Sequence, residues 1–135
     1  MLKRLHHVAI AVKDIDAVLG DYAEILGLPK TKVVYIESQA VKATLIPIGD
    51  CELELIEPTD PNGGVAKFLA KNGEAPHHVC FESHDVDKEL QELEKKGMRL
   101  IDKKSRPGLA GMVGFIHPQS TRGTLVEICT PVQHQ

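Results

Sequence analysis

The sequence predicts an α+β fold in which two tandem βαβββ modules form one curved, half-open, barrel-like sheet. The main observation is a repeated pair of motifs: LHHVAIAV at 5–12 precedes LEL at 53–55, and PHHVCFES at 76–83 precedes VEI at 126–128. The second histidines of the motifs lie 71 positions apart, and the central glutamates lie 73 apart. A histidine and a carboxylate therefore recur together with nearly one period.

The first module is predicted to contain one helix between a first strand and three later ones. Apolar residues recur at helical spacing over 15–26, after the capping candidate Asp14 and before Gly27, which suits a left-handed helix cap. The dipeptide Gly49-Asp50 predicts a tight hairpin between two β-like runs. The predicted elements are a strand at 5–12, the helix, and strands at 31–37, 41–48 and 51–57.

The second module repeats this order after a turn-rich segment and a short linking helix at about 63–73. The run from Ser105 to Gly111, which contains Pro107, is interpreted as a loop that either closes over a substrate or simply connects two strands. We expect one domain over 1–135, with module 1 at about 1–58 and module 2 at about 76–131. The predicted elements of module 2 are a strand at 77–82, a helix at 85–96 and strands at 98–102, 112–117 and 124–130.

Composition limits the class of protein. A chain of 135 residues with 42% hydrophobic and 26% charged residues is long enough to bury a core as one compact domain. The net charge of −3 is spread along the chain without a basic stripe, which excludes a nucleic-acid or anionic-membrane partner and favours a small molecule. No apolar run approaches the roughly 20 residues of a membrane span, and no signal peptide is evident, so a cytoplasmic location is expected.

Strand parity places the repeated histidines and glutamates on one type of face. Successive side chains of a strand point to opposite sides, so the valines and isoleucines that suit helix packing leave His7 and His78 on the other face. The same alternation sets Glu54 and Glu127 opposite their apolar neighbours. If the modules curve into one cup, the four side chains converge, and two imidazoles with two carboxylates suit a divalent transition metal. Each residue alone is ordinary, but the shared period and face favour a metal site.

Other histidines and cysteines of the same strands are assigned structural roles. His6 and His77 are the natural competitors for the ligand positions, but parity places them with the helix-facing valines. The three cysteines, Cys51, Cys80 and Cys129, occur singly within apolar strand-like runs. They are predicted to be reduced core thiols that form neither disulfides nor a metal site.

The paired modules with their His, Glu, His and Glu positions resemble the vicinal oxygen chelate superfamily, which includes glyoxalase I, extradiol dioxygenases, antibiotic-resistance proteins and methylmalonyl-CoA epimerases. The resemblance covers essentially the whole chain, and within the superfamily the sequence is most similar to the epimerases. The most specific stretch is FIHPQSTRGTLVEI at 115–128. Epimerases carry an HP…G.L.E segment there, whereas glyoxalase I usually has a DPDG turn.

The resemblance implies epimerisation of the 2R and 2S forms of methylmalonyl-CoA by proton abstraction at C2 through a metal-stabilised enolate. Glu127 is the first candidate for a catalytic base, and Glu54 is the second. The family suggests Co²⁺ as the cofactor and a homodimer as the assembly, although this donor set also accepts Mn²⁺, Ni²⁺ or Zn²⁺. The implied metal ligands are His7, Glu54, His78 and Glu127.

Two parts of the active site stay open at this point. Ala43 stands where some epimerases have a glutamate, so the base for the opposite face of the enolate is unassigned, with Glu54 or a water as candidates. The residues that bind the CoA phosphates are equally open. The basic candidates are Lys67, Lys71, Lys103, Lys104, Arg106 and Arg122.

Three alternative functions use the same fold. A glyoxalase I-like lyase acting on a thiol adduct would be favoured only if the HP…G segment did not indicate an epimerase. A non-catalytic binding protein of the antibiotic-sequestering type needs no metal, so four intact ligands argue against it. An extradiol dioxygenase normally uses two histidines and one glutamate on iron, which would leave Glu54 unexplained.

Overall fold

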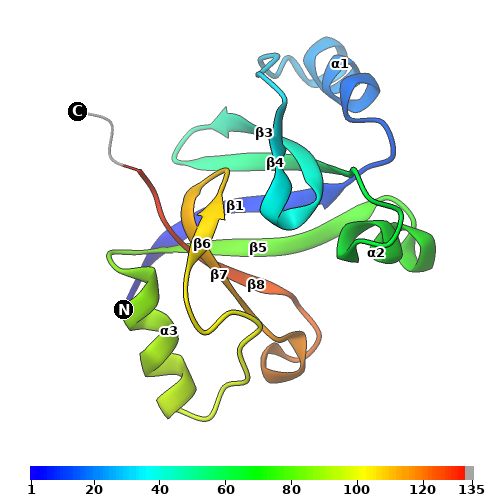
Figure 1. Ribbon diagram of the computed structural model, residues 1–135. Coiled ribbons are helices and arrows are strands. Elements are labelled where there is room, and N and C mark those ends of the chain that lie inside the picture. Colours follow the sequence, from blue (N-terminus) through cyan, green and yellow to red (C-terminus); the bar gives the residue numbers. More distant parts are fainter. Residues whose placement is uncertain (133–135) are drawn as a thin grey trace. The chain divides into compact units, whose positions relative to one another are not determined.

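The computed structural model describes residues 1–132, and these confirm the predicted α+β class with the βαβββ order in both modules (Figure 1). The chain divides into two compact units. The N-terminal unit is Val8–His77, and the C-terminal unit combines Met1–His7 with the chain from His78 onward. The first strand, β1 (Leu2–Ala11), therefore contributes its beginning to the C-terminal unit and its end to the N-terminal unit.

The predicted helix of the first module is correct at both ends. Helix α1 spans Ile15–Leu26, the side chain of Asp14 accepts a hydrogen bond from the Ala17 N–H, and Gly27 has φ of 69°, in the left-handed region. These caps satisfy backbone groups that the helix itself leaves unpaired. The apolar side of α1 packs on the end of β1 and on two further strands. That core consists of Val12, Ile15, Leu19, Ile46 and Leu55.

The strands of the N-terminal unit follow the order β2-β3-β4-β1. The predicted hairpin is present, since Ile48 pairs with Cys51 and Gly49 has φ of 57°. The strand predicted at 31–37 is shorter than expected, because the Thr44 hydroxyl donates to the Lys32 carbonyl at 3.0 Å and so occupies a backbone acceptor that a longer strand would use. The elements are β2 (Val34–Ile36), β3 (Val41–Ile48), β4 (Cys51–Pro58) and the linking helix α2 (Gly64–Asn72).

The strands of the C-terminal unit follow the order β5-β8-β7-β6, with β5 parallel to β8 and the other pairs antiparallel (Figure 1). Helix α3 (Val86–Lys95) packs Val86 and Leu90 against Ile116 and Ile128. Gly114 lies under this helix, where an added Cβ would meet Leu90 Cδ1 at 2.6 Å. The strands are β5 (Ala75–Ser83), β6 (Arg106–Gly108), β7 (Gly111–Ile116) and β8 (Val126–Thr130).

The predicted strand at 98–102 is wrong. Leu100 forms only an isolated bridge to Ile116, and the strand of the module is instead β6, inside the predicted 105–111 loop. Side chains explain the shift: the Asp87 carboxylate accepts hydrogen bonds from the Ser105 N–H at 2.7 Å and hydroxyl at 2.8 Å, and thereby places the chain beside β7. Pro107 is tolerated because β6 is an edge strand that needs no N–H at that position.

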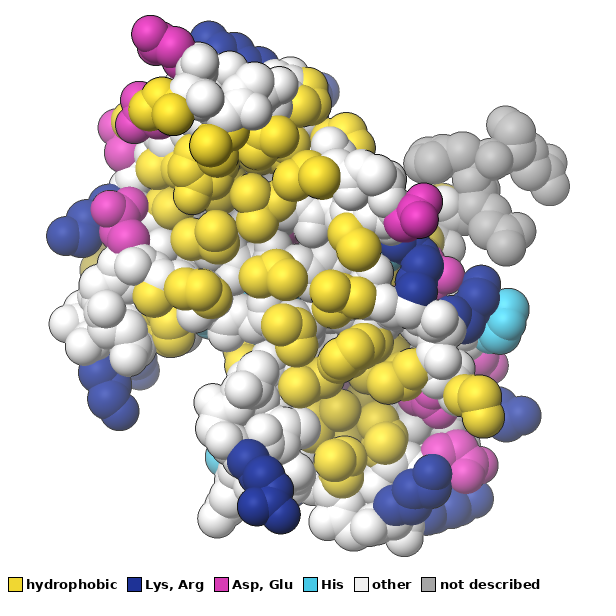
Figure 2. Space-filling model, turned by 180° about the vertical axis from the view of Figure 1, so that it is seen from behind, with side chains coloured by type: hydrophobic (Ala, Val, Ile, Leu, Met, Phe, Trp, Pro, Cys, Tyr) yellow, Lys and Arg dark blue, Asp and Glu magenta, His cyan; other side chains and the backbone are white. Residues whose placement is uncertain are grey.

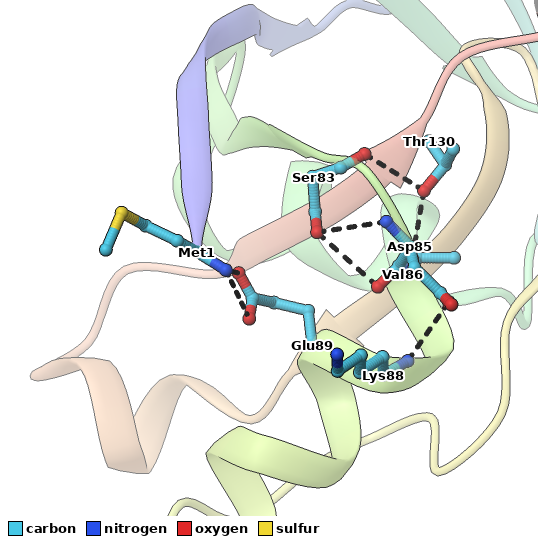
Figure 3. A network of polar contacts seen from close by, with 7 residues as sticks. All are labelled: Met1, Ser83, Asp85, Val86, Lys88, Glu89 and Thr130. Carbon is cyan, nitrogen blue, oxygen red and sulfur yellow. Dashed lines mark hydrogen bonds and ion pairs between the residues drawn. The ribbon is translucent and has the colours of Figure 1, made fainter.

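A hydrogen-bond network holds the N-terminus of α3 to the end of β8 (Figure 3). The Asp85 side chain accepts from the Lys88 N–H at 3.1 Å and caps the helix. The Thr130 hydroxyl accepts from the Val86 N–H at 2.9 Å and donates to the Ser83 carbonyl at 3.1 Å. The network ties the helix to the strand that carries Glu127.

Replacing Asp85 by alanine is expected to destabilise the protein by about 1 kcal/mol, because the helix loses its capping acceptor. Urea unfolding followed by circular dichroism measures the change. Asp85→Asn is the matched control, since an asparagine oxygen also caps helices well. Equal losses in the two variants would show that the carboxylate charge, and not the cap, matters.

Three further features from the sequence analysis can be compared with the described residues. All three cysteines are free, as predicted, and Cys80 and Cys129 are buried, whereas Cys51 is only partly buried and so is not the core residue that the sequence predicted. No helix among these residues is long and apolar enough to cross a membrane. On the face that Figure 2 presents, the described acidic and basic side chains are interspersed and form no continuous basic area.

Candidate metal centre

Three of the four predicted ligands meet inside the C-terminal unit. His7 comes from β1, His78 from β5 and Glu127 from β8, and their exposed fractions are 1%, 4% and 3%. His7 Nε2 lies 3.0 Å from Glu127 Oε1, and His78 Nε2 lies 3.2 Å from the same oxygen. The two Nε2 atoms are 3.3 Å apart. One carboxylate oxygen and two imidazole nitrogens thus form a compact, buried triangle.

Strand parity accounts for this convergence in the C-terminal unit. Val126 and Ile128 pack with the α3 core, so Glu127 between them projects from the opposite face of β8. Glu127 pairs in register with Cys80 of β5, which is also fully buried on that opposite face. The alternation of apolar and functional residues that the sequence displays is therefore the alternation of the two faces of the sheet.

The carboxylate of Glu127 is held in its charged form. Burial acts to raise its pKa, but the imidazoles of His7 and His78 outweigh that effect and leave the pKa well below its usual range. Within the described residues, Glu127 Oε1 has no hydrogen-bond donor in acceptable geometry, although both imidazole nitrogens lie near it. A buried anionic oxygen without a donor is costly, and a cation would satisfy it.

The dimensions of the triangle fit a first-row divalent cation. Nitrogen and oxygen ligands lie about 2.1 Å from such an ion, so neighbouring ligand atoms lie about 3.0 Å apart at right angles and about 3.4 Å apart in a tetrahedron. The three observed separations, 3.0, 3.2 and 3.3 Å, fall in that range. The donor set of two imidazoles and a carboxylate is also one that these ions accept. The residues therefore fit the cation that the sequence predicted.

The fourth predicted ligand, Glu54, belongs to β4 of the N-terminal unit and is 7% exposed. Its neighbour Leu55 packs in the α1 core, so Glu54 projects from the face away from that helix, as parity predicted. On this face it pairs with Leu45 and is followed by Ile56, which pairs with Ala43. Glu54 is thus a buried carboxylate whose partner across the strands is the apolar Leu45.

The thiol of Cys80 lies beside the triangle but does not suit the ligand role. Ligand atoms of His7, Cys80 and Glu127 all lie within 4.8 Å of one another. Burial raises the pKa of the Cys80 thiol far above its ordinary value, and Cys129 and Glu127 raise it further. Because metals bind the thiolate and not the thiol, the prediction that Cys80 is a core residue agrees with this environment.

The prediction that His6 faces the helices with the valines is wrong, because its ring lies beside that of His7 and near the thiols of Cys80 and Cys129 on the face away from α3. His6 Nδ1 lies 2.8 Å from His7 Nδ1, and the exposed fraction of His6 is 4%. The corresponding residue of the second motif, His77, instead packs edge-on against Phe68 of α2 with ring centroids 4.8 Å apart. The two histidine pairs look identical in the sequence, so no sequence signal distinguishes the partner of His6 from that of His77.

The basic candidates for CoA binding are partly engaged within their own unit. Arg106 Nε lies 3.2 Å from Asp102 Oδ1, and its guanidinium lies 5.5 Å from the centroid of the Phe115 ring. Lys103 lies 3.7 Å from Glu94 in an exposed ion pair. These contacts bring no set of basic residues together as a phosphate site, and the CoA-binding prediction stays a prediction.

This chain is similar to known proteins whose family agrees with the fold and the site described above. The family model for the Glyoxalase/Bleomycin resistance protein/Dioxygenase superfamily matches residues 6–116. The chain belongs to this superfamily. It is also 33% identical over 129 residues to the human mitochondrial methylmalonyl-CoA epimerase, a match that covers 94% of this chain and 73% of the human protein. The chain is accordingly an enzyme of the methylmalonyl-CoA epimerase family.

Other relatives agree with this placement. An ethylmalonyl-CoA/methylmalonyl-CoA epimerase of Cereibacter sphaeroides is 32% identical over 131 residues, covering 95% of this chain and 98% of that protein. An uncharacterised Bacillus subtilis protein, YqjC, is 37% identical, covering 96% and 94%. A Streptomyces coelicolor methylmalonyl-CoA epimerase variant in complex with 2-nitronate-propionyl-CoA superposes with a TM-score of 0.94 at 33% identity, covering 100% of this chain and 99% of that one.

Proposed function

We propose that this protein interconverts the 2R and 2S epimers of methylmalonyl-CoA by moving the proton at C2 with the help of a bound divalent cation. The observation that carries the proposal is the buried triangle of His7, His78 and Glu127, in which Glu127 Oε1 lacks a hydrogen-bond donor among the described residues. The substrate is suggested by relatives: the human one is named as a methylmalonyl-CoA epimerase, and solved structures of such epimerases contain methylmalonyl-CoA or 2-nitronate-propionyl-CoA.

The chemistry of the substrate explains why a charged, dry site is needed. The C2 proton lies between a thioester and a carboxylate, and its removal leaves an enolate oxygen that must be stabilised. A divalent cation, when bound, supplies positive charge next to that oxygen. His7 and His78 supply neutral nitrogen donors for it, and Glu127 supplies one carboxylate oxygen for the cation and has a second oxygen that can accept the C2 proton.

Glu54 is proposed as the fourth ligand and as the candidate for the second base. Epimerisation requires proton transfer on both faces of the planar enolate, and Glu127 serves one face. Ala43, on the same face of the sheet as Glu54, is 1% exposed and cannot transfer a proton. Glu54, a buried carboxylate on the same face of these paired strands, is therefore our candidate to act in its place, either directly or through a water.

The nature of the cation, the assembly and the location belong to the same proposal. Cobalt is the expected ion, and manganese, nickel and zinc suit the same donors. The homodimer and the cytoplasmic location stay predictions. Size-exclusion chromatography with light scattering tests the dimer, and comparison of activity in protein loaded with each metal in turn identifies the preferred ion.

Deuterium incorporation tests the proposed function. Protein stripped with a chelator and reloaded with Co²⁺, Mn²⁺, Ni²⁺ or Zn²⁺ is incubated with methylmalonyl-CoA in D₂O, and deuterium at C2 is followed by mass spectrometry. We expect exchange that is lost in the stripped protein and restored by at least one metal. Absence of exchange with all four ions would overturn the proposal. A parallel reaction with ethylmalonyl-CoA is informative, because the Cereibacter sphaeroides relative is named for both substrates.

A further inference from the structure

We propose that His6 is a positioning residue that fixes the orientation and the tautomer of His7, so that Nε2 of His7 presents a lone pair to the cation. This role goes beyond the proposed activity but rests on the proposed metal site. The observation that carries it is the 2.8 Å separation of His6 Nδ1 and His7 Nδ1, between two rings that meet edge to face at 81°.

The direction of this hydrogen bond follows from the geometry of the triangle. His7 Nε2 is the nitrogen that faces Glu127 Oε1 and His78 Nε2. A neutral imidazole that binds a metal through Nε2 carries its proton on Nδ1. The Nδ1–H of His7 therefore donates to Nδ1 of His6, which accepts with its lone pair and carries its own proton on Nε2.

Burial makes this hydrogen bond consequential. His6 and His7 are 4% and 1% exposed, so water competes poorly for the bond between them. The nearby thiols offer no equivalent acceptor. A ring nitrogen of His6 and the Sγ atoms of Cys80 and Cys129 lie within 4.8 Å of one another, but thiols are weak hydrogen-bonding groups. Loss of the His6 ring nitrogen would leave a buried N–H of His7 without this acceptor and free the ring to rotate.

Zinc affinity measures this role without relying on activity. Wild-type protein, His6→Asn, His6→Phe and His77→Asn are titrated with Zn²⁺ in competition with a chromophoric chelator. Since loss of the hydrogen-bond partner of a metal-binding histidine typically weakens affinity by about 10–100-fold, we expect a decrease of this size for His6→Phe. His6→Asn should stay close to wild type, because its Oδ1 occupies the place of the accepting Nδ1. His77→Asn is the matched control and should leave affinity unchanged, since His77 packs on Phe68.

Nuclear magnetic resonance provides a second measurement that does not depend on a folded variant. In zinc-loaded wild-type protein, long-range ¹H–¹⁵N spectra report which ring nitrogens carry protons. We expect protonated Nδ1 in His7, with unprotonated Nδ1 and protonated Nε2 in His6. A proton on His6 Nδ1 would overturn the proposal, as would unchanged affinity in His6→Phe or equal losses in His6→Phe and His6→Asn.

The outcomes also separate this inference from the proposed function. If zinc binds with the expected ranking of variants but no metal supports deuterium exchange, the substrate assignment fails and the role of His6 stands. If exchange occurs and the His6 variants bind zinc equally well, the role of His6 fails alone. Two zinc ions per chain, one of them lost in both His6 variants, would make His6 a ligand and overturn the positioning role.

Discussion

Glu127→Gln is expected to lower the rate of deuterium exchange into methylmalonyl-CoA by about 10²–10⁴-fold, because glutamine cannot accept the C2 proton and general bases contribute a factor of this size. The amide keeps the shape of the side chain between Val126 and Ile128, so the α3 core should remain intact. Exchange is followed by mass spectrometry on metal-loaded protein, and zinc affinity is measured on the same sample.

Glu82→Gln is the matched control for this variant. Glu82 lies on β5 of the same unit and pairs with Lys3 at 3.2 Å and Arg4 at 3.3 Å. The Glu82→Gln variant should therefore lose these two ion pairs and retain the exchange activity. An unchanged rate in Glu127→Gln would show that Glu127 is not the base. Loss of exchange with zinc binding retained would separate the basic role of Glu127 from its role as a ligand.

Gly111→Ala is expected to destabilise the protein by about 3–5 kcal/mol, which places it among the largest effects of single substitutions. Gly111 has φ of 121°, a conformation that residues with a Cβ rarely adopt. The added methyl group would also overlap the Thr130 carbonyl oxygen and lie 2.9 Å from Pro131 Cα. Because both contacts are with backbone, no side-chain rotation relieves them.

Thermal unfolding by calorimetry should show a decrease in Tm of roughly 10 °C or more for this variant. The matched control is Gly27→Ala, where φ is 69° and no atom lies within 4 Å of the added Cβ, so only backbone strain of about 1 kcal/mol is expected. Similar losses in the two variants would contradict the steric explanation. Gly111→Ala should also weaken zinc binding, because Thr130 ends the strand that carries Glu127.

Elements whose signal lies within a short stretch of chain were predicted accurately from the sequence. Helix α1 has the predicted bounds because Asp14 and Gly27 cap it through bonds to groups only a few residues away. The faces of His7, His78 and Glu127 were also predicted correctly, since alternation along a strand is a local property that burial in the sheet makes regular.

Elements that depend on partners distant in the sequence were not predicted accurately. The strand expected at 98–102 lies at Arg106–Gly108, because Asp87 of another element binds Ser105 and fixes where the chain meets β7. The 98–102 run does bond to the end of β7, but both the Ile101 and the Asp102 N–H groups donate to the same Phe115 carbonyl, so the contact stays an isolated bridge at Leu100 and does not extend into a strand. Local periodicity carries no information about such competition.

The sequence by itself determined the class of fold, the repeated donors and the face that each one occupies, because these follow from strand alternation and from a repeat with nearly constant period. Only the tertiary structure decided that the facing side-chain atoms of His7, His78 and Glu127 lie within 3.3 Å of one another. It also decided that the ring of His6 bonds to that of His7, whereas the ring of His77 packs on Phe68. Identical His-His pairs acquire different partners because each ring meets different neighbouring elements, and those neighbours are set by packing between segments far apart in the chain.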